Sequence, residues 1–153
     1  MSGVYNDGIK TLPVVDGADI REYLLVSFNS DGEITPFVNA SGEILLGSTE
    51  ASSENGVAAV RMCNVAGSRY LKLDSSETIA AGGWFTHGTT AGTIAPVGDG
   101  DAILGFALEG ATSDADAYAV IECVLLGGYA SAGDAIANGE LDNFPVGPLV
   151  PAT

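Results

Sequence analysis

Residues 33–50 (EITPFVNASGEILLGSTE) and residues 93–109 (TIAPVGDGDAILGFALE) follow one pattern. Each stretch begins with a short apolar segment containing a proline, passes through a turn rich in Gly, Asp or Asn, and continues into an apolar segment containing Leu-Gly. Short apolar segments bounded by Gly, Pro, Asn and Asp are typical of β-strands joined by tight turns. The chain is therefore expected to build one strand-rich unit twice.

The repeat extends in both directions from these two stretches. Its proposed matches are 31–37 with 91–97, 45–47 with 103–105, 50–53 with 109–113, and 59–63 with 119–123. Two copies are too few for a solenoid, which needs about three repeats. We therefore expect the two halves to cover each other's apolar faces, related by a pseudo-twofold rotation.

The fold class predicted from this pattern is all-β, a small β-barrel or sandwich built from two pseudo-repeated halves. Aromatic residues make up only 7% of the 153 residues while glycine occurs 21 times, a mixture that favours short strands and tight turns. No stretch has the pattern of an ordinary amphipathic helix. The expected strands are 23–28, 33–38, 43–47, 57–65, 69–73, 84–86, 93–97, 103–109 and 117–126.

Two prolines, Pro36 and Pro96, hold equivalent places in the repeat. Proline cannot donate a hydrogen bond to a neighbouring strand, so it belongs at a sheet edge, a bulge or a strand end. A barrel corner in each half would explain both residues, and a position in loops is the alternative.

The expected organisation is an N-terminal arm (1–22), a β-barrel domain (23–126) and a Gly- and Pro-containing C-terminal arm (127–153). The arms carry scattered apolar residues, and prolines keep the second one extended, which favours docking on a partner. A disordered terminus is the alternative. The predicted partner-contact residues are Ile9, Leu12, Val14, Leu141, Phe144, Val146, Leu149 and Val150.

The net charge of −15 excludes direct nucleic-acid binding, because five scattered Lys and Arg residues cannot neutralise phosphates. An anionic membrane surface is disfavoured for the same reason. The start of the chain has no basic and apolar signal segment, and no apolar run approaches the roughly 20 residues of a membrane helix. Two cysteines are too few for a disulfide scaffold, so we expect synthesis in a reducing cytoplasm.

No residue pattern predicts catalysis, and no cofactor or metal is expected. The only histidine, His87, is predicted to lie in a solvated turn, and Cys63 and Cys123 are predicted to pack as small apolar side chains. The acidic runs 99–101 and 113–116 look like fragments of a calcium loop but lack its length and closing glutamate, so solvated turns are favoured.

Segment 82–121, with Gly-Gly before an apolar strand, an Ile-Ala-Pro strand, an Ile-Leu-Gly-Phe-Ala-Leu strand and a final Tyr-Ala-Val-Ile strand, resembles the small capsid cement or decoration proteins of tailed bacteriophages. The resemblance covers roughly residues 23–126. It implies a small β-barrel and a homotrimer that binds major capsid protein on the outside of the shell, and it carries no catalytic residues. The longer arms of this chain depart from the shorter members of that family.

The function expected from these observations is that of a non-enzymatic virion protein. It would be made in the host cytoplasm, sit on the exterior of the capsid and stabilise it by bridging major capsid protein subunits. The alternative is a receptor- or carbohydrate-binding β-module of a phage fibre or spike, which needs a cluster of exposed aromatic residues. A barrel enzyme of the cupin type is disfavoured because its metal site needs several histidines.

Overall fold

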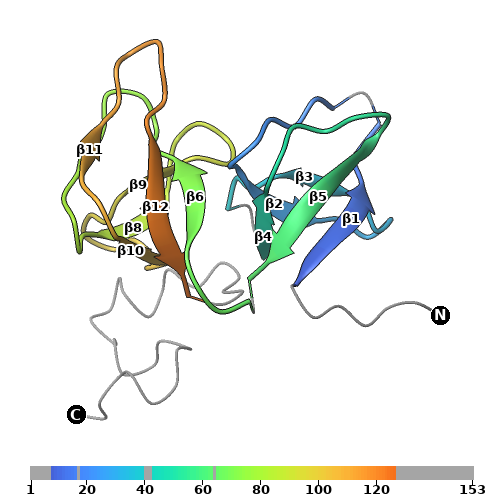
Figure 1. The fold of residues 1–153 in the computed structure, drawn as a ribbon, viewed down its shortest axis with the longest axis horizontal. Helices are drawn as coiled ribbons and strands as arrows, with labels where there is room; N and C mark the ends of the chain where they lie inside the picture. The colour runs from blue at the N-terminus through green and yellow to red at the C-terminus, as the bar shows by residue number, and fades with distance from the viewer. Residues whose placement is uncertain (1–7, 17, 40–42, 64, 127–153) are drawn as a thin grey trace.

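The computed structural model describes residues 8–16, 18–39, 43–63 and 65–126, and these residues form an all-β fold, as predicted. Its strands gather into two groups that lie side by side along the long axis of the molecule (Figure 1). We call the first group the N-barrel and the second the C-barrel. In the described part of the chain no helix is long and apolar enough to span a membrane.

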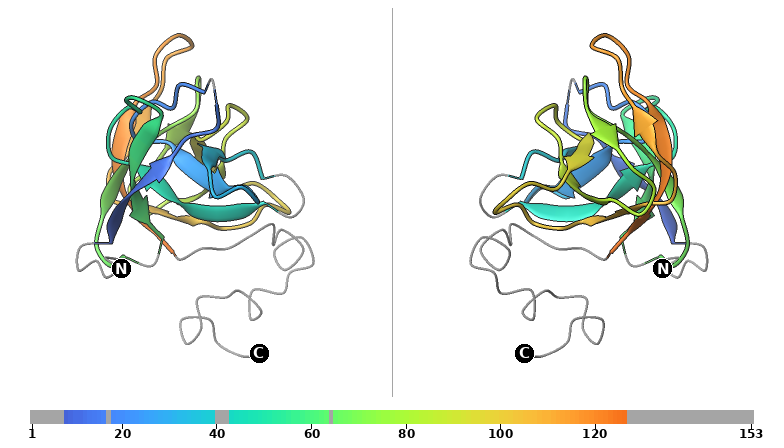
Figure 2. Two further views of the ribbon diagram at one scale, coloured as in Figure 1. Left: turned by 90° about the vertical axis from the view of Figure 1, so that its right-hand side faces the viewer. Right: turned by 90° about the vertical axis from the view of Figure 1, so that its left-hand side faces the viewer.

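The N-barrel is a five-stranded antiparallel sheet with the strand order β1-β5-β4-β2-β3. A parallel bridge between Val14, just after β1, and Ile34 joins the first strand to the last and closes the sheet. Viewed from the ends of the molecule, the strands wrap around instead of lying in one flat layer (Figure 2). The strand bounds are β1 (Ile9–Pro13), β2 (Leu25–Phe28), β3 (Ile34–Pro36), β4 (Ile44–Thr49) and β5 (Val57–Met62).

The C-barrel repeats this topology with the order β6-β12-β10-β8-β9, and a bridge between Leu73 and Ile94 closes it in the same way. One addition sets it apart, a two-stranded ribbon of β7 (Thr78–Ile79) and β11 (Ala111–Thr112). The other strand bounds are β6 (Arg69–Lys72), β8 (Trp84–His87), β9 (Ile94–Pro96), β10 (Gly105–Ala107) and β12 (Val120–Leu125).

Strand register identifies equivalent residues in the two barrels. Val26 lies opposite Pro36 and Gly47, and Phe85 lies opposite Pro96 and Gly105, so Val26 and Phe85 are equivalent. Both prolines end a strand at the edge of the hydrogen-bonded order, as predicted. The repeat seen in the sequence is therefore a repeat of the fold.

Both repeat glycines are required by close approach of the backbone. A Cβ atom on Gly47 would lie 2.1 Å from the carbonyl oxygen of Arg61, and one on Gly105 would lie 2.1 Å from that of Val124. No side chain fits at such a distance from a neighbouring strand. The Leu-Gly element of the sequence pattern thus marks the contact between β4 and β5 and between β10 and β12.

One of the predicted matches is wrong. Gly47 lies opposite Met62 and Gly105 lies opposite Leu125, which makes Met62 and Leu125 equivalent. Cys123 then corresponds to Val60, and Cys63 falls beyond the end of β5. The C-barrel has a longer connection before its last strand, and this insertion shifted the match based on sequence spacing by three residues.

The N-terminal boundary also differs from the prediction. Residues 9–13, expected to belong to an arm, form β1 and pair with β5. Leu12, Val14 and Ile20 are buried in the core of the N-barrel. Apolar and polar residues alternate only weakly in Ile9–Pro13, and the segment ends at a proline, so its sequence pattern does not predict a strand. Pairing with β5 stabilises the strand instead.

Buried apolar side chains form two clusters. The first fills the N-barrel and consists of Leu12, Val14, Ile20, Val26, Ile34, Ala58 and Val60. The second fills the C-barrel and continues to the N-barrel, because it includes four N-barrel residues: Leu25, Phe37, Leu45 and Cys63. The two barrels therefore share a continuous apolar junction.

Candidate interaction surface

Backbone hydrogen bonds join the two barrels at their junction. The N–H of Leu25 donates to the carbonyl of Gly92 at 2.8 Å, and the N–H of Gly92 donates to the carbonyl of Phe37 at 2.9 Å. Nearby, the N–H of Lys72 donates to the carbonyl of Tyr23 at 3.0 Å. The N-barrel thus presents β2 and its flanking residues to β6 and the turn before β9.

Arg69 is the main polar residue of the junction and is only 4% exposed. Its guanidinium donates to the carbonyls of Arg61 at 2.9 Å and Met62 at 3.0 Å, and to the hydroxyl of Ser48 at 3.1 Å. Burial lowers the pKa of Arg69 from its usual value, but an arginine remains charged in proteins. Groups of the N-barrel accept from both terminal nitrogens, which ties the two barrels together, while Nε is buried without a hydrogen-bond partner among the described residues.

His87 lies at the junction, so its predicted place in a solvated turn is wrong. It is the last residue of β8, and its Nε2 lies 3.1 Å from the side-chain nitrogen of Asn39. Its ring meets that of Phe37 edge-on, with centroids 6.2 Å apart. The described surroundings of His87 include no nucleophile or carboxylate hydrogen-bonded to the ring, and the residue serves as a contact between barrels.

The junction is head-to-tail, so the predicted pseudo-twofold relation is wrong. A twofold axis would bring the same positions of each barrel into contact. Here the N-barrel contributes Tyr23, Leu25, Phe37, Asn39 and Ser48, whereas the C-barrel contributes Arg69, Tyr70, Lys72, His87 and Gly92. By register, these two sets are not equivalent to each other.

The C-barrel has its own copy of the surface that the N-barrel uses at the junction. Strand register places Trp84 at the position of Leu25 and Phe106 at the position of Ser48. Leu25 is fully buried, whereas Trp84 is 49% exposed and meets Phe106 edge-on at 5.6 Å between ring centroids. We call this surface the outer face. By strand register and matching backbone hydrogen bonds, it comprises the equivalents of Leu25, Phe37, Leu45, Ser48 and Cys63, which are Trp84, Val97, Ile103, Phe106 and Leu126.

Two carboxylates have strongly perturbed pKa values. Burial alone would raise the pKa of Asp74, which is 3% exposed, but hydrogen bonds from Thr90, Ser75 and Thr89 outweigh it and lower the pKa to about 2. The pKa of Glu22 is lowered to about 2, chiefly by the hydroxyl of Ser52. Asp74 accepts bonds from turn residues only, an arrangement that stabilises the loop before β9.

The two cysteines are free and buried, as predicted for core residues. Burial raises the pKa of both Cys63 and Cys123 to about 12, which leaves them protonated and unreactive. Among the described residues, no group of three or more His, Cys, Asp or Glu side chains could hold a metal ion. In the run 99–101, Asp101 accepts a hydrogen bond from Gly98 across the turn.

The predicted partner-contact residues fall into two groups. Leu12 and Val14 are core residues of the N-barrel, and Ile9 begins β1. The remaining five, Leu141, Phe144, Val146, Leu149 and Val150, lie outside the described residues. The sequence prediction missed the outer face, although aligning Trp84 with Leu25 would have shown an aromatic residue where the first half has an aliphatic one.

Comparison with protein-family models and with curated protein sequences gives no match. Comparison with solved structures gives a similarity to the N-terminal base of the head fibre protein gp8.5 of bacteriophage phi29. The TM-score is 0.52 at 17% sequence identity, over 76% of this chain and 93% of the fibre base. At this identity the likeness is one of fold.

Proposed function

We propose that the chain is a structural protein of a bacteriophage head. It binds the outer surface of the capsid and stabilises the shell by bridging neighbouring major capsid protein subunits. The single observation that carries this proposal is the likeness in fold to the base of a phage head fibre over nearly the whole length of that base. The sequence resemblance to phage decoration proteins supports the same assignment independently.

Charge and surface chemistry support an outside location. A net charge of −15 repels packaged DNA and is compatible with a solvated exterior. The described surface also carries exposed apolar side chains away from the outer face, among them Val38, Ile44 and Leu108, which suit attachment through burial rather than chemistry on a substrate. We propose no enzymatic activity, cofactor or metal, and we place synthesis in the host cytoplasm.

The proposed oligomeric state is a homotrimer. Open sheet edges give little reason for association, because the bridges Val14–Ile34 and Leu73–Ile94 close each barrel. The partly exposed outer face supports association, because exposed aromatic clusters mark interaction sites.

A sedimentation experiment tests the proposed function. Purified chain is mixed with empty shells of the major capsid protein from the same phage and pelleted, with shells of an unrelated phage as the control. We expect saturable binding to the cognate shells only, together with a higher temperature of shell disruption. A chain that stays in the supernatant with cognate shells contradicts the proposal.

A second candidate function is a carbohydrate- or receptor-binding module of a fibre or spike. The edge-on pair of Trp84 and Phe106 favours it, since exposed aromatic rings can stack on sugar faces. Trp84 is the only tryptophan, so its fluorescence reports directly on this surface. Saturable fluorescence changes with host surface glycans, without binding to shells, would favour this candidate.

A further inference from the structure

The junction between the barrels has two sides, and each barrel contains both. One side is formed by β2 and β4 in the N-barrel, and its equivalents in the C-barrel are β8 and β10. The other side is formed by β6 in the C-barrel, and its equivalent in the N-barrel is β1. Each chain therefore has one further copy of each side, and Figure 1 places β8 and β10 toward one end of the long axis and β1 toward the other.

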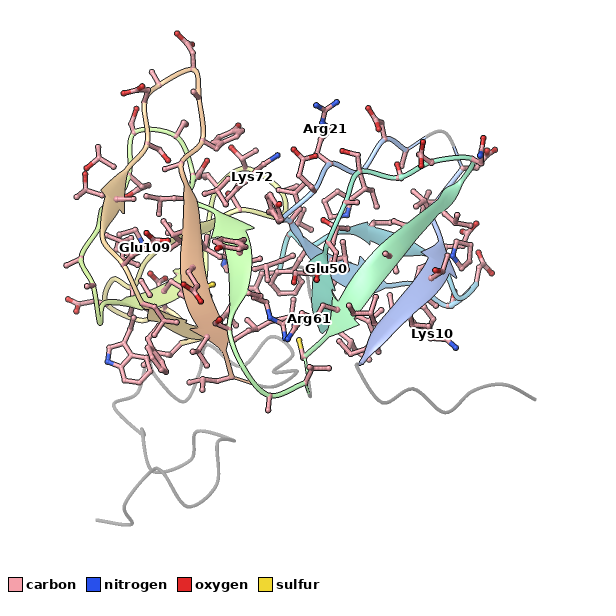
Figure 3. The ribbon with its side chains drawn as sticks, in the orientation of Figure 1. Lys10, Arg21, Glu50, Arg61, Lys72 and Glu109 are labelled. Atoms are coloured by element: carbon pink, nitrogen blue, oxygen red, sulfur yellow. The ribbon has the colours of Figure 1, made fainter. Side chains whose placement is uncertain are left out.

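The second of these sides is the flank of the N-barrel, which we define as Lys10, Pro13, Phe28 and Gly32. Register makes these residues equivalent to Arg69, Lys72, His87 and Gly92, all of which contact the N-barrel at the junction. Phe28 is 39% exposed, and Pro13 is also exposed. Figure 3 shows Lys10 on the outer end of the N-barrel, while Arg61 and Glu50 lie toward the junction.

Two equivalent glycines show that the turn at Gly32 is less covered than its counterpart at the junction. Gly92 and Gly32 have almost the same backbone angle, with φ of 83° and 80°. A Cβ atom on Gly92 would lie 2.9 Å from Cβ of Leu24 in the other barrel, whereas one on Gly32 would have, among the described residues, only the Phe28 ring nearby, at 3.9 Å. The same turn is thus tightly packed against the other barrel at the junction and loosely packed on the flank.

The outer face can be superposed on the N-barrel side of the junction, and the flank on the C-barrel side. The side chains that then meet are chemically compatible. The contact between Phe37 and His87 becomes one between Val97 and Phe28, both apolar. The contact between Ser48 and Arg69 becomes one between Phe106 and Lys10, a pair suited to a cation–π interaction.

The superposition also removes polar contacts. Lys72, whose ammonium lies 3.5 Å from Glu22 at the junction, is replaced on the flank by Pro13. Contacts formed by Trp84, Phe106, Phe28 and Pro13 would be richer in aromatic and apolar groups than the junction itself. That composition is typical of the core of a protein interface.

We propose that the outer face of the C-barrel binds the N-barrel flank of a second copy of this chain, repeating the head-to-tail junction between molecules. Such a heterologous contact leaves one free side at each end, so copies add until they close into a ring or, where the rotation between them does not close, form an open filament. With the homotrimer of the proposed function, the ring contains three chains and six barrels. This number of chains rests on the proposed function, whereas the contact itself rests on the internal repeat.

Two single variants, Trp84→Asp and Phe28→Asp, test the contact. Each places a charge in one side only and at an exposed position, so the fold should persist, which circular dichroism and thermal melting verify. Sedimentation velocity should give an oligomer for the natural chain and monomers for each variant, because loss of an interface aromatic weakens binding about 30-fold or more. Tyr118→Asp, another exposed aromatic position outside both surfaces, should leave the oligomer intact.

Mixing the two variants gives the decisive result. Trp84→Asp retains a normal flank and Phe28→Asp retains a normal outer face, so the mixture should form a one-to-one dimer that cannot grow. A monomeric natural chain, or two variants that stay monomeric when mixed, would overturn the contact. A natural oligomer that does not pellet with cognate shells would instead overturn the proposed function and leave this contact standing.

Discussion

The N-barrel and the C-barrel share strand order, register, closing bridge and glycine contacts, yet their equivalent surfaces differ in what covers them. Leu25 and Ser48 of the N-barrel are buried at the junction, while Trp84 and Phe106 at the same positions of the C-barrel are partly exposed. Equivalent interior positions are apolar in both barrels because both must pack a core, whereas the equivalent surfaces differ in what lies against them. The comparison therefore locates an interaction surface without reference to any ligand.

Substitutions in the interiors of the two barrels should lower the free energy of unfolding most. Phe85 and its equivalent Val26 are fully buried in their barrels. Phe85→Ala is expected to lower the free energy of unfolding by about 3–5 kcal/mol, and Val26→Ala by less, because fewer buried methylene groups are removed. Urea denaturation of both variants measures the difference. A loss below about 1 kcal/mol for either variant would contradict the equivalent, fully buried positions of the two residues.

Substitutions at the equivalent surface positions Leu25 and Trp84 should differ clearly in their effect on the free energy of unfolding. Leu25→Ala is expected to cost about 2–5 kcal/mol, because Leu25 is fully buried between the barrels. Trp84→Ala is expected to stay within about 0.5 kcal/mol of the parent, as exposed positions usually do. Both are measured by chemical denaturation in a Phe28→Asp background, so that association makes no contribution. A costly Trp84→Ala would mean that this side chain is packed within its own chain.

Arg69 at the junction should make an intermediate contribution to the free energy of unfolding. Arg69→Met removes the donors to the carbonyls of Arg61 and Met62 and is expected to cost about 1–3 kcal/mol. The control is Arg61→Met, which breaks only a partly exposed ion pair with Glu50 at 3.8 Å and should cost less than about 1 kcal/mol. Equal costs in thermal melting would show that Arg69 does not join the barrels.

The dependence of stability on acid pH should also distinguish the two barrels. The pKa of Asp74 falls from 3.8 to about 2 on folding, so its contribution is present above pH 4 and is lost as the pH falls toward 2. The equivalent residue in the N-barrel is Val15, which does not titrate. Asp74→Asn should be less stable at pH 7, by about 1–3 kcal/mol, and lose less stability between pH 4 and pH 2.

A second acidic group sets the control for that experiment. Glu22, whose pKa falls from 4.5 to about 2, should retain its own contribution in the Asp74→Asn variant. Some loss of stability between pH 4.5 and pH 2 is therefore expected to remain. An unchanged pH profile of stability in Asp74→Asn would contradict the role of the Asp74 turn.

Much of the fold follows from short-range patterns in the sequence. Turn glycines and prolines marked strands in both halves, and all nine predicted segments overlap observed strands. The strands that were not predicted, β1, β7 and β11, lack strong alternation and are stabilised by pairing with distant segments. Such pairing depends on tertiary contacts, which no local pattern contains.

The interaction surface was harder to predict, for a physical reason. Whether an aromatic residue such as Trp84 is buried depends on what its strand packs against, and spacing along the chain does not specify that. The head-to-tail junction is also invisible to a pattern that only identifies two similar halves. The misplacement of Cys63 had a similar origin, because a longer connection before β12 shifted the spacing without changing the topology.

Cross-linking tests the central claim most directly, because the chain contains its own reference. Tyr23→Cys with Tyr70→Cys places thiols across the junction within one chain, where the two ring centroids lie 5.9 Å apart, and Gly82→Cys with Thr11→Cys places them at the equivalent exposed positions. The natural Cys63 and Cys123 are buried with raised pKa values and should not react. With a short bis-maleimide, the first pair should give an intramolecular link, and the second a ladder of linked dimers and trimers. The head-to-tail contact would be contradicted if the first pair links fully but the second pair gives no linked dimers or trimers.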